Sequence, residues 1–105
     1  MRIAITSAGD TLDSTIDSRF GRCAFFAIYD TETKATYFLQ NPAKEASEGA
    51  GPAAVQFVGA QKVQKIVSGE FGMKIKSLLE SLHIEMITNK DSASKIADII
   101  EMYKP

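Results

Sequence analysis

The run CAFFAIYD, residues 23–30, constrains the fold more than any other part of the chain. Its apolar side chains fall on both alternating faces of an extended strand, as in a strand that is covered on both sides of a sheet. The β-branched run RIAITS, residues 2–7, predicts a first strand. The polar TETK at 31–34 separates CAFFAIYD from the strand-like ATYFLQN at 35–41, so these two runs are expected to form a hairpin.

After the hairpin the hydrophobic period changes from two residues to that of a helix. The pattern predicts helices over 52–61, 71–82 and 91–103, alternating with strands over 63–69 and 84–88. Pro52, directly after Gly51, is expected at the first helical position.

Two of the predicted helices carry an apolar stripe that would face a core. The stripe of the second helix consists of Ile75, Leu78, Leu79 and Leu82. The stripe of the third consists of Ile96, Ile99, Ile100 and Tyr103. Asp91 or Ser92 is expected to cap the third helix.

The predicted order of elements is βββαβαβα in a single domain, residues 1–105. The later strand–helix–strand units call for right-handed crossovers and parallel pairing, whereas the hairpin makes the second strand antiparallel to its neighbours. We therefore expect an α/β fold with a mixed five-stranded sheet in the order 3-2-1-4-5, covered on both faces by three helices.

Composition excludes several classes of function. The net charge is −1, from 12 basic and 13 acidic residues, so no general electrostatic attraction to nucleic acid or membranes is expected. The single cysteine allows no internal disulfide, and no apolar run is long enough for a signal peptide or a membrane span. These features predict a cytoplasmic protein whose partners include neither nucleic acid nor membrane.

The predicted topology brings the loops 7–22, 41–51, 69–72 and 88–91 to one edge of the sheet, where open α/β sheets bind ligands. Six of the seven glycines fall there: Gly9, Gly21, Gly49, Gly51, Gly69 and Gly72. Two of these loops open helices, whose free N–H groups favour anions, and Arg19 and Arg22 could add charge-assisted bonds. A pocket for an anion is one interpretation. Ordinary turn chemistry is the other, since neither loop matches a Walker or dinucleotide fingerprint.

Cys23 and His83 are the side chains with the most reactive chemistry. Cys23 is a candidate thiolate ligand or nucleophile, and Arg22 could lower its pKa, but a small buried hydrophobe is the favoured interpretation. One cysteine cannot supply the usual four thiolates of an iron–sulfur cluster, although it could supply one ligand to a preassembled cluster. His83 is expected at the opposite edge of the sheet. The strands lack the paired carboxylates of a two-metal nuclease.

Several motifs resemble a known family in their order and spacing: MRIAITS, FGRCAFFAIYD, Asn41-Pro42, the GAG of residues 49–51, and SGEFG before the second helix. The chain resembles, over nearly its full length, the dinitrogenase iron–molybdenum cofactor biosynthesis family. That family includes small cofactor carriers and the C-terminal domain of a nitrogenase cofactor-assembly enzyme. The resemblance implies a ribonuclease H-like α/β fold and non-covalent binding of an iron–molybdenum cluster or a precursor, without catalysis.

The resemblance assigns cofactor-binding roles to a defined set of positions: Arg19, Phe20, Gly21, Arg22, Gly49, Gly51, Gly69 and Gly72. Cys23 is the one candidate metal ligand. The chain departs from the family at Glu48, where many members have histidine, and at Met73, where proline is frequent. A carboxylate at position 48 would repel an anionic cluster, although it could bind a bare cation.

Three hypotheses follow. The first is a small binding protein for a metal cluster or another anionic cofactor, with a protein partner in cofactor trafficking, whose ligand is lost on Arg22→Ala or Gly49→Val. The second is an interaction or regulatory module of the same fold that no longer binds a cluster. The third is an enzyme that depends on Cys23 and is inactivated by Cys23→Ser.

Overall fold

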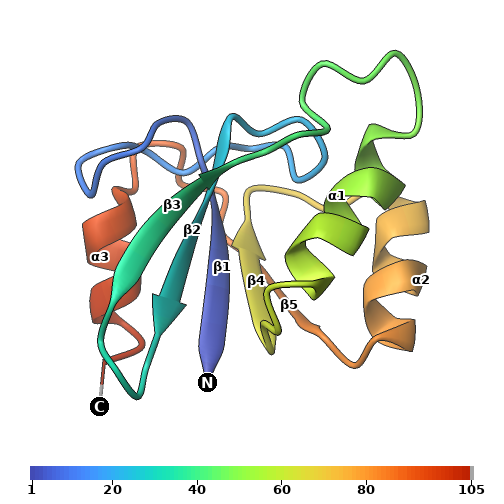
Figure 1. The fold of residues 1–105 in the computed structure, drawn as a ribbon. Helices are drawn as coiled ribbons and strands as arrows, with labels where there is room; N and C mark the ends of the chain where they lie inside the picture. Colours follow the sequence, from blue (N-terminus) through green and yellow to red (C-terminus); the bar gives the residue numbers. More distant parts are fainter. Residues whose placement is uncertain (105) are drawn as a thin grey trace.

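The hairpin expected from residues 23–41 forms one side of a five-stranded sheet in the computed structural model, which describes residues 1–104 (Figure 1). The strands are β1 (Arg2–Ser7), β2 (Phe25–Asp30), β3 (Thr36–Gln40), β4 (Lys65–Ser68) and β5 (Glu85–Thr88). Their spatial order is β3-β2-β1-β4-β5; β2 is antiparallel to both neighbours, and β1, β4 and β5 are parallel. The predicted mixed sheet is confirmed.

The helices α1 (Ala50–Gly59), α2 (Met73–Ser81) and α3 (Ile96–Glu101) cover the two faces of this sheet. One buried cluster unites the sheet with α1 and α2, and the other unites it with α3. Strand β2 contributes Phe26 and Ile28 to the first cluster and Ala27 and Tyr29 to the second. The doubly apolar pattern of CAFFAIYD therefore has the predicted cause, a strand buried on both faces.

All three helix starts differ from their predicted positions; α2 begins at Met73, two residues late. Helix α1 begins at Ala50 with Gly49 as its N-cap, so Pro52 lies at the third helical position. Proline is tolerated there because the N–H groups of a first turn have no partner within the helix.

Helix α3 begins at Ile96, and the predicted cap at Asp91 or Ser92 is wrong. The Asp91 side chain instead accepts a hydrogen bond from Ala93 N (3.0 Å), within a turn that precedes the helix. That turn is tied to the long first loop, residues 8–24, since Ile16 N donates to Ser94 O and Lys95 forms a bridge with Thr15. Pairing with a distant loop therefore replaces the expected first turn of the helix.

The apolar stripe of α3 is confirmed, with Ile96, Ile99 and Ile100 buried and Tyr103, beyond the end of the helix, partly buried. Only two of the four residues predicted to form the buried stripe of α2 are buried. Ile75 and Leu79 are buried, whereas Leu78 and Leu82 are 38% and 51% exposed, because α2 packs against the core along a narrower face. No helix in residues 1–104 is long and apolar enough to cross a membrane.

Candidate functional site

The candidate site lies at the edge of the sheet where β1, β4 and β5 end and β2 begins (Figure 1). The long first loop, residues 8–24, runs across this edge. It is tied down by isolated bridges from Ile16 to Ser7 and from Arg19 to Glu70. Helices α1 and α2 both begin at the same edge and run away from it, so their N-terminal ends face in the same direction.

Three of the predicted glycines lie at close contacts between protein segments, and at Gly21 and Gly69 the neighbour is backbone. A Cβ atom on Gly21 would lie 3.0 Å from the Cα of Gly51, and one on Gly69 would collide with the backbone of Ser18. A Cβ on Gly51 would meet the Cδ1 atom of Ile75 at 2.5 Å. These positions let the first loop, α1 and α2 pack closely together, so their lack of a side chain has a structural cause.

Gly49 and Gly72 are exposed and lack the close contacts of Gly21, Gly51 and Gly69. No atom lies within 4 Å of a Cβ placed on Gly49, and the nearest to one on Gly72 is 4.0 Å away. Gly49 has φ 71°, a conformation that glycine adopts most readily. The two residues are the N-caps of α1 and α2, and no side chain in residues 1–104 caps either helix. The first-turn N–H groups have no partner within a helix. Helix α1 offers fewer of them than α2, because Pro52 has no N–H and the backbone of Gly51 packs against Gly21.

The two arginines have different roles. Arg22 Nη1 donates to the carbonyl oxygens of Lys44 (3.0 Å) and Ala46 (2.7 Å), and so holds the loop that leads into α1. The Arg19 side chain is 56% exposed, with its Nε 3.5 Å from Asp17 Oδ1. Arg19 is therefore the freer cation, while Arg22 shapes the loop beside the start of α1.

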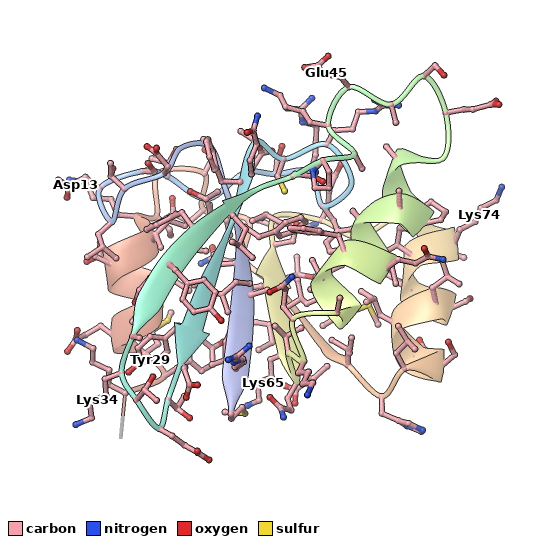
Figure 2. All side chains as sticks on the ribbon, viewed as in Figure 1. Asp13, Tyr29, Lys34, Glu45, Lys65 and Lys74 are labelled. Carbon is pink, nitrogen blue, oxygen red and sulfur yellow. The ribbon has the colours of Figure 1, made fainter. Side chains whose placement is uncertain are left out.

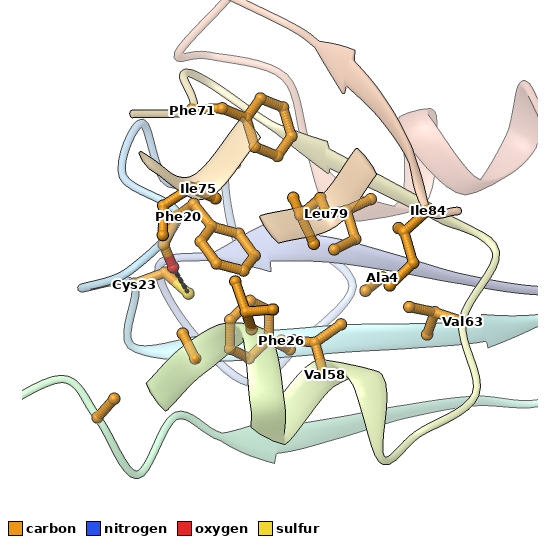
Figure 3. Close-up of a cluster of buried hydrophobic side chains, with 14 of the residues drawn as sticks. Ala4, Phe20, Cys23, Phe26, Val58, Val63, Phe71, Ile75, Leu79 and Ile84 are labelled. Atoms are coloured by element: carbon orange, nitrogen blue, oxygen red, sulfur yellow. Dashed lines mark hydrogen bonds between the residues drawn. The ribbon is translucent and has the colours of Figure 1, made fainter. Parts of the chain in front are cut away.

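Phe20 lies in the core, where the family resemblance had placed a cofactor contact. It is 3% exposed, and its ring packs against Phe26 and Phe71 with centroid distances of 5.7 and 5.9 Å (Figure 3). The ring anchors the first loop between the sheet and the loop that opens α2.

Cys23 is also enclosed. Its thiol is completely buried and donates to the carbonyl oxygen of Phe20 (3.4 Å), as Figure 3 shows. Burial, and secondarily the negative charge of Asp17, raise the pKa of Cys23 to about 12. The expected lowering of this pKa by Arg22 is wrong, because the guanidinium is directed to the loop carbonyls instead. A protonated, buried thiol is poorly suited to bind metal.

The Asn41 side chain joins two loops of the site, a role that was not predicted from the sequence. It is 3% exposed, and its Nδ2 donates to the carbonyl oxygens of Gly21 and Cys23, both at 3.0 Å. Its Oδ1 accepts from Ala43 N at 3.0 Å. One amide side chain thus joins the first loop to the loop before α1. The Asn41-Pro42 pair was among the motifs of the family resemblance. The sequence around Asn41 does not show, however, that its side chain binds distant carbonyl groups.

A cavity of about 240 Å³ occupies the other half of this edge, at the ends of β4 and β5. Its walls include Ser18, Glu70, Asn89 and Lys90, and among the predicted site residues only Gly69 lines it. The structure thus separates the predicted residues into two groups. Five of them lie around the helix starts: Gly21, Arg22, Gly49, Gly51 and Gly72. Gly69 lines the cavity, and Arg19 pairs with Glu70, another residue of its wall.

Side chains that commonly ligate metals do not gather at this edge. In the part of the chain that the structure describes, no three His, Cys, Asp or Glu residues are placed to hold a metal ion. His83 lies between α2 and β5, exposed and at the opposite edge of the sheet, as its position in the sequence predicts. What this edge offers a ligand is backbone N–H groups and the exposed Arg19, together with the carboxylates of Glu48 and Glu70.

Comparison with known families identifies the chain. A family model described as dinitrogenase iron–molybdenum cofactor matches residues 1–105. The chain belongs to this family. The predicted membership is confirmed over the whole sequence.

Solved structures share the fold. The apo form of the orange protein from Desulfovibrio gigas is 28% identical, with a TM-score of 0.89 over 97% of this chain and 85% of that one. A putative NifB protein from Thermotoga is 25% identical, with a TM-score of 0.81 over 97% of this chain and 85% of that one. The protein PH0822, at 23% identity and a TM-score of 0.81 over 98% and 89% of the two chains, shows the fold alone. Among curated proteins, none matches.

Proposed function

We propose that this protein is a small non-catalytic carrier that binds an iron–molybdenum cluster, or a related anionic precursor, at the strand carboxyl edge. The observation that carries the proposal is the pair of exposed helix starts at Gly49 and Gly72, neither of which has a side-chain cap. Membership in a family described by the iron–molybdenum cofactor supplies the ligand class. The orange protein supports it, because an apo form is a protein from which a bound group is absent.

The donor groups at the edge suit an anion that is held without covalent ligation. The first turns of α1 and α2 lie side by side, as the approach of Gly51 to Ile75 shows, so their N–H groups and positive dipole ends act together. Arg19 lies next to the loop that opens α2, because its backbone bridges Glu70, and its side chain is 56% exposed beside Asp17. Cys23 does not fit the role of a cluster ligand, because its thiol is buried and protonated. We therefore assign the binding to Arg19 and the backbone around Gly49, Gly51 and Gly72, and give Gly21, Arg22, Gly69 and Phe20 the role of shaping that surface.

The test is an anaerobic titration of the protein with isolated iron–molybdenum cofactor, followed by gel filtration and metal analysis of the protein peak. We expect stoichiometric co-elution of molybdenum and iron. Arg19→Gln should weaken binding without disturbing the fold, since the side chain is largely exposed. Lys62→Gln, beyond the far end of α1, removes the same charge from another place and should leave binding unchanged.

Arg22→Ala tests the loop that Arg22 holds. It should weaken binding as well, because the carbonyls of Lys44 and Ala46 lose their donor and the loop before Gly49 is released. Absence of co-elution at a large excess of cofactor would refute the carrier function for this ligand.

An interaction or regulatory module of the same fold is the second candidate. The observation that favours it is Glu48, an exposed carboxylate directly before the N-cap of α1. A negative charge at this position complements the helix dipole itself and repels an external anion. If this module is the function, Glu48→His should restore cluster binding to a protein that otherwise shows none.

A further inference from the structure

The two outermost strands of the sheet differ in their protection against pairing with another strand. Outer strands of natural proteins are usually very short, or carry charged residues, proline or a bulge, because their open row of backbone N–H and C=O groups pairs readily. Strand β5 is four residues long and begins with the exposed Glu85. Strand β3, TYFLQ, contains no charge and no proline, and its register with β2 is unbroken. It therefore lacks the protection that β5 has.

The outer side of β3 presents the backbone groups of alternate residues. Asn41 N, directly after the strand, donates to Ala24 O at 3.0 Å. Because hydrogen-bonded and non-hydrogen-bonded pairs alternate along an antiparallel ladder, the odd-numbered residues from 35 to 41 bond to β2. The backbone groups that point away from β2 belong to three residues: Thr36, Phe38 and Gln40. These N–H and C=O groups form no hydrogen bond within residues 1–104.

The outer side of β3 is open. Only β2 pairs with β3 among residues 1–104, and the three helices lie over the faces of the sheet. In Figure 1 β3 lies in front of β2, and no other segment crosses in front of it. Gln40 is exposed, and Thr36 and Phe38 are half-buried. The charged side chains lie beyond the two ends of the strand, as Figure 2 shows for Lys34 and Glu45.

We propose that β3 pairs antiparallel with β3 of a second copy of this chain, so that the two sheets become one continuous sheet. The three outward residues are spaced symmetrically about Phe38. Antiparallel pairing centred on Phe38 therefore gives every outward N–H and C=O group a partner, with Thr36 of each copy opposite Gln40 of the other. This interface does not depend on the proposed function at the glycine-rich edge.

The side chains of β3 are complementary to themselves in this register, which favours a second copy as the partner. Phe38 meets its counterpart on the face of the sheet where it packs against the cluster under α3. Tyr37 of one copy lies beside Leu39 of the other on the opposite face, where both pack against the cluster under α1 and α2. Such aromatic pairs stabilise antiparallel sheets, and no like charges lie opposite each other within the strand.

The experiment is sedimentation velocity of the full chain over a range of protein concentrations. A strand of five residues spans about 17 Å, so the interface is small and we expect a weak dimer, with a Kd of roughly 100 μM. Concentrations well below and well above this value should show a monomer–dimer equilibrium. In NMR spectra of the ¹⁵N-labelled protein, the amides of residues 36, 38 and 40 should exchange with solvent more slowly as concentration rises. Those of residues 37 and 39 are already bonded to β2 and should change less.

Two double variants test the register. Thr36→Lys combined with Gln40→Lys places like charges opposite each other at both ends of the paired strands, and should raise the Kd of the dimer by about tenfold. Thr36→Glu combined with Gln40→Lys places opposite charges at the same positions and should leave the dimer as tight as in the parent or tighter. Both side chains are polar and at least partly exposed, so both variants should fold, which circular dichroism checks.

The matched control is Gln56→Lys combined with Ser77→Lys, which adds two positive charges at exposed positions of α1 and α2. It should dimerise as the parent does. A protein that stays monomeric at the highest concentration would overturn the proposal and leave β3 to a strand of a different protein. A dimer that responds equally to the two β3 variants, or equally to the lysine pair on β3 and to the control, would overturn it as well.

Discussion

Cys23 illustrates how the surroundings of one residue set its chemistry. Beside an arginine in the sequence, its thiol was a candidate for activation, yet in the fold it is buried and donates to the Phe20 carbonyl. Its neighbour Arg22 is occupied by two loop carbonyls. Burial therefore affects the pKa of this thiol more than the arginine adjacent to it in the sequence does.

The raised pKa of Cys23 predicts a loss of stability in alkaline solution. The thiol titrates near pH 9.0 when unperturbed and near 12 in the fold, so between these values the unfolded chain loses a proton that the folded chain retains. The free energy of unfolding should therefore fall as pH rises above 9, by up to about 1.4 kcal/mol per pH unit from this group. Below pH 9 the thiol contributes no pH dependence.

The measurement is urea unfolding of the parent and of Cys23→Ala at a series of pH values from 7 to 11. Taking the difference between the two proteins cancels the titration of other groups. A difference that stays constant across this range would contradict the assigned pKa. Iodoacetamide should also label native Cys23 far more slowly than the unfolded chain.

Asn41 is the second residue whose environment determines its importance. Asn41→Ala should lower the free energy of unfolding by about 2–3 kcal/mol, because the Gly21 and Cys23 carbonyls and the Ala43 N–H lose their partner in a buried place. Asn89→Ala is the control, since Asn89 is partly exposed and its side chain accepts one bond, from Asp91 N. Equal losses in denaturant unfolding of the two variants would show that Asn41 does not join the loops as described.

At the scale of elements, the glycines divide by what surrounds them. Gly69 packs against the backbone of Ser18, whereas Gly72 has ordinary φ of −69° and open space around it. Gly69→Ala should therefore destabilise the protein by about 1–3 kcal/mol, since backbone must move to admit the methyl group. Gly72→Ala should cost less, about 1 kcal/mol, because alanine is a poorer N-cap than glycine but meets no backbone there. A loss on Gly72→Ala as large as that on Gly69→Ala would mean that the start of α2 is more tightly enclosed than the structure shows.

Helix α2 shows why an element's buried face is harder to predict than its existence. The stripe of residues 75, 78, 79 and 82 correctly predicted an amphipathic helix. Which part of the stripe is covered depends on how α2 packs against α1 and the sheet, and this packing leaves Leu78 and Leu82 partly exposed. The hydrophobic period alone does not show which part of the stripe is covered.

At the scale of the whole molecule, binding of the proposed cluster should stabilise the fold. A ligand that binds only the native state raises the free energy of unfolding by about 2.7 kcal/mol at a concentration of 100 times its Kd. The midpoint of thermal unfolding, measured anaerobically, should rise with iron–molybdenum cofactor in the parent and rise less in Arg19→Gln. An unchanged midpoint at saturating cofactor would contradict binding to the native state.

The sequence by itself determined the order of elements, the antiparallel hairpin and the resulting sheet order β3-β2-β1-β4-β5. These follow from hydrophobic period and short connections, which are local properties. It also predicted the family, whose model matches residues 1–105.

Only the tertiary structure decided what individual residues do. Phe20, Cys23 and Gly21 are buried or packed against other segments, and Asn41 joins two loops. Each of these properties depends on atoms distant in the sequence. A residue's type fixes its possible chemistry, but its burial, its pKa and its partners are set by segments that only folding brings together.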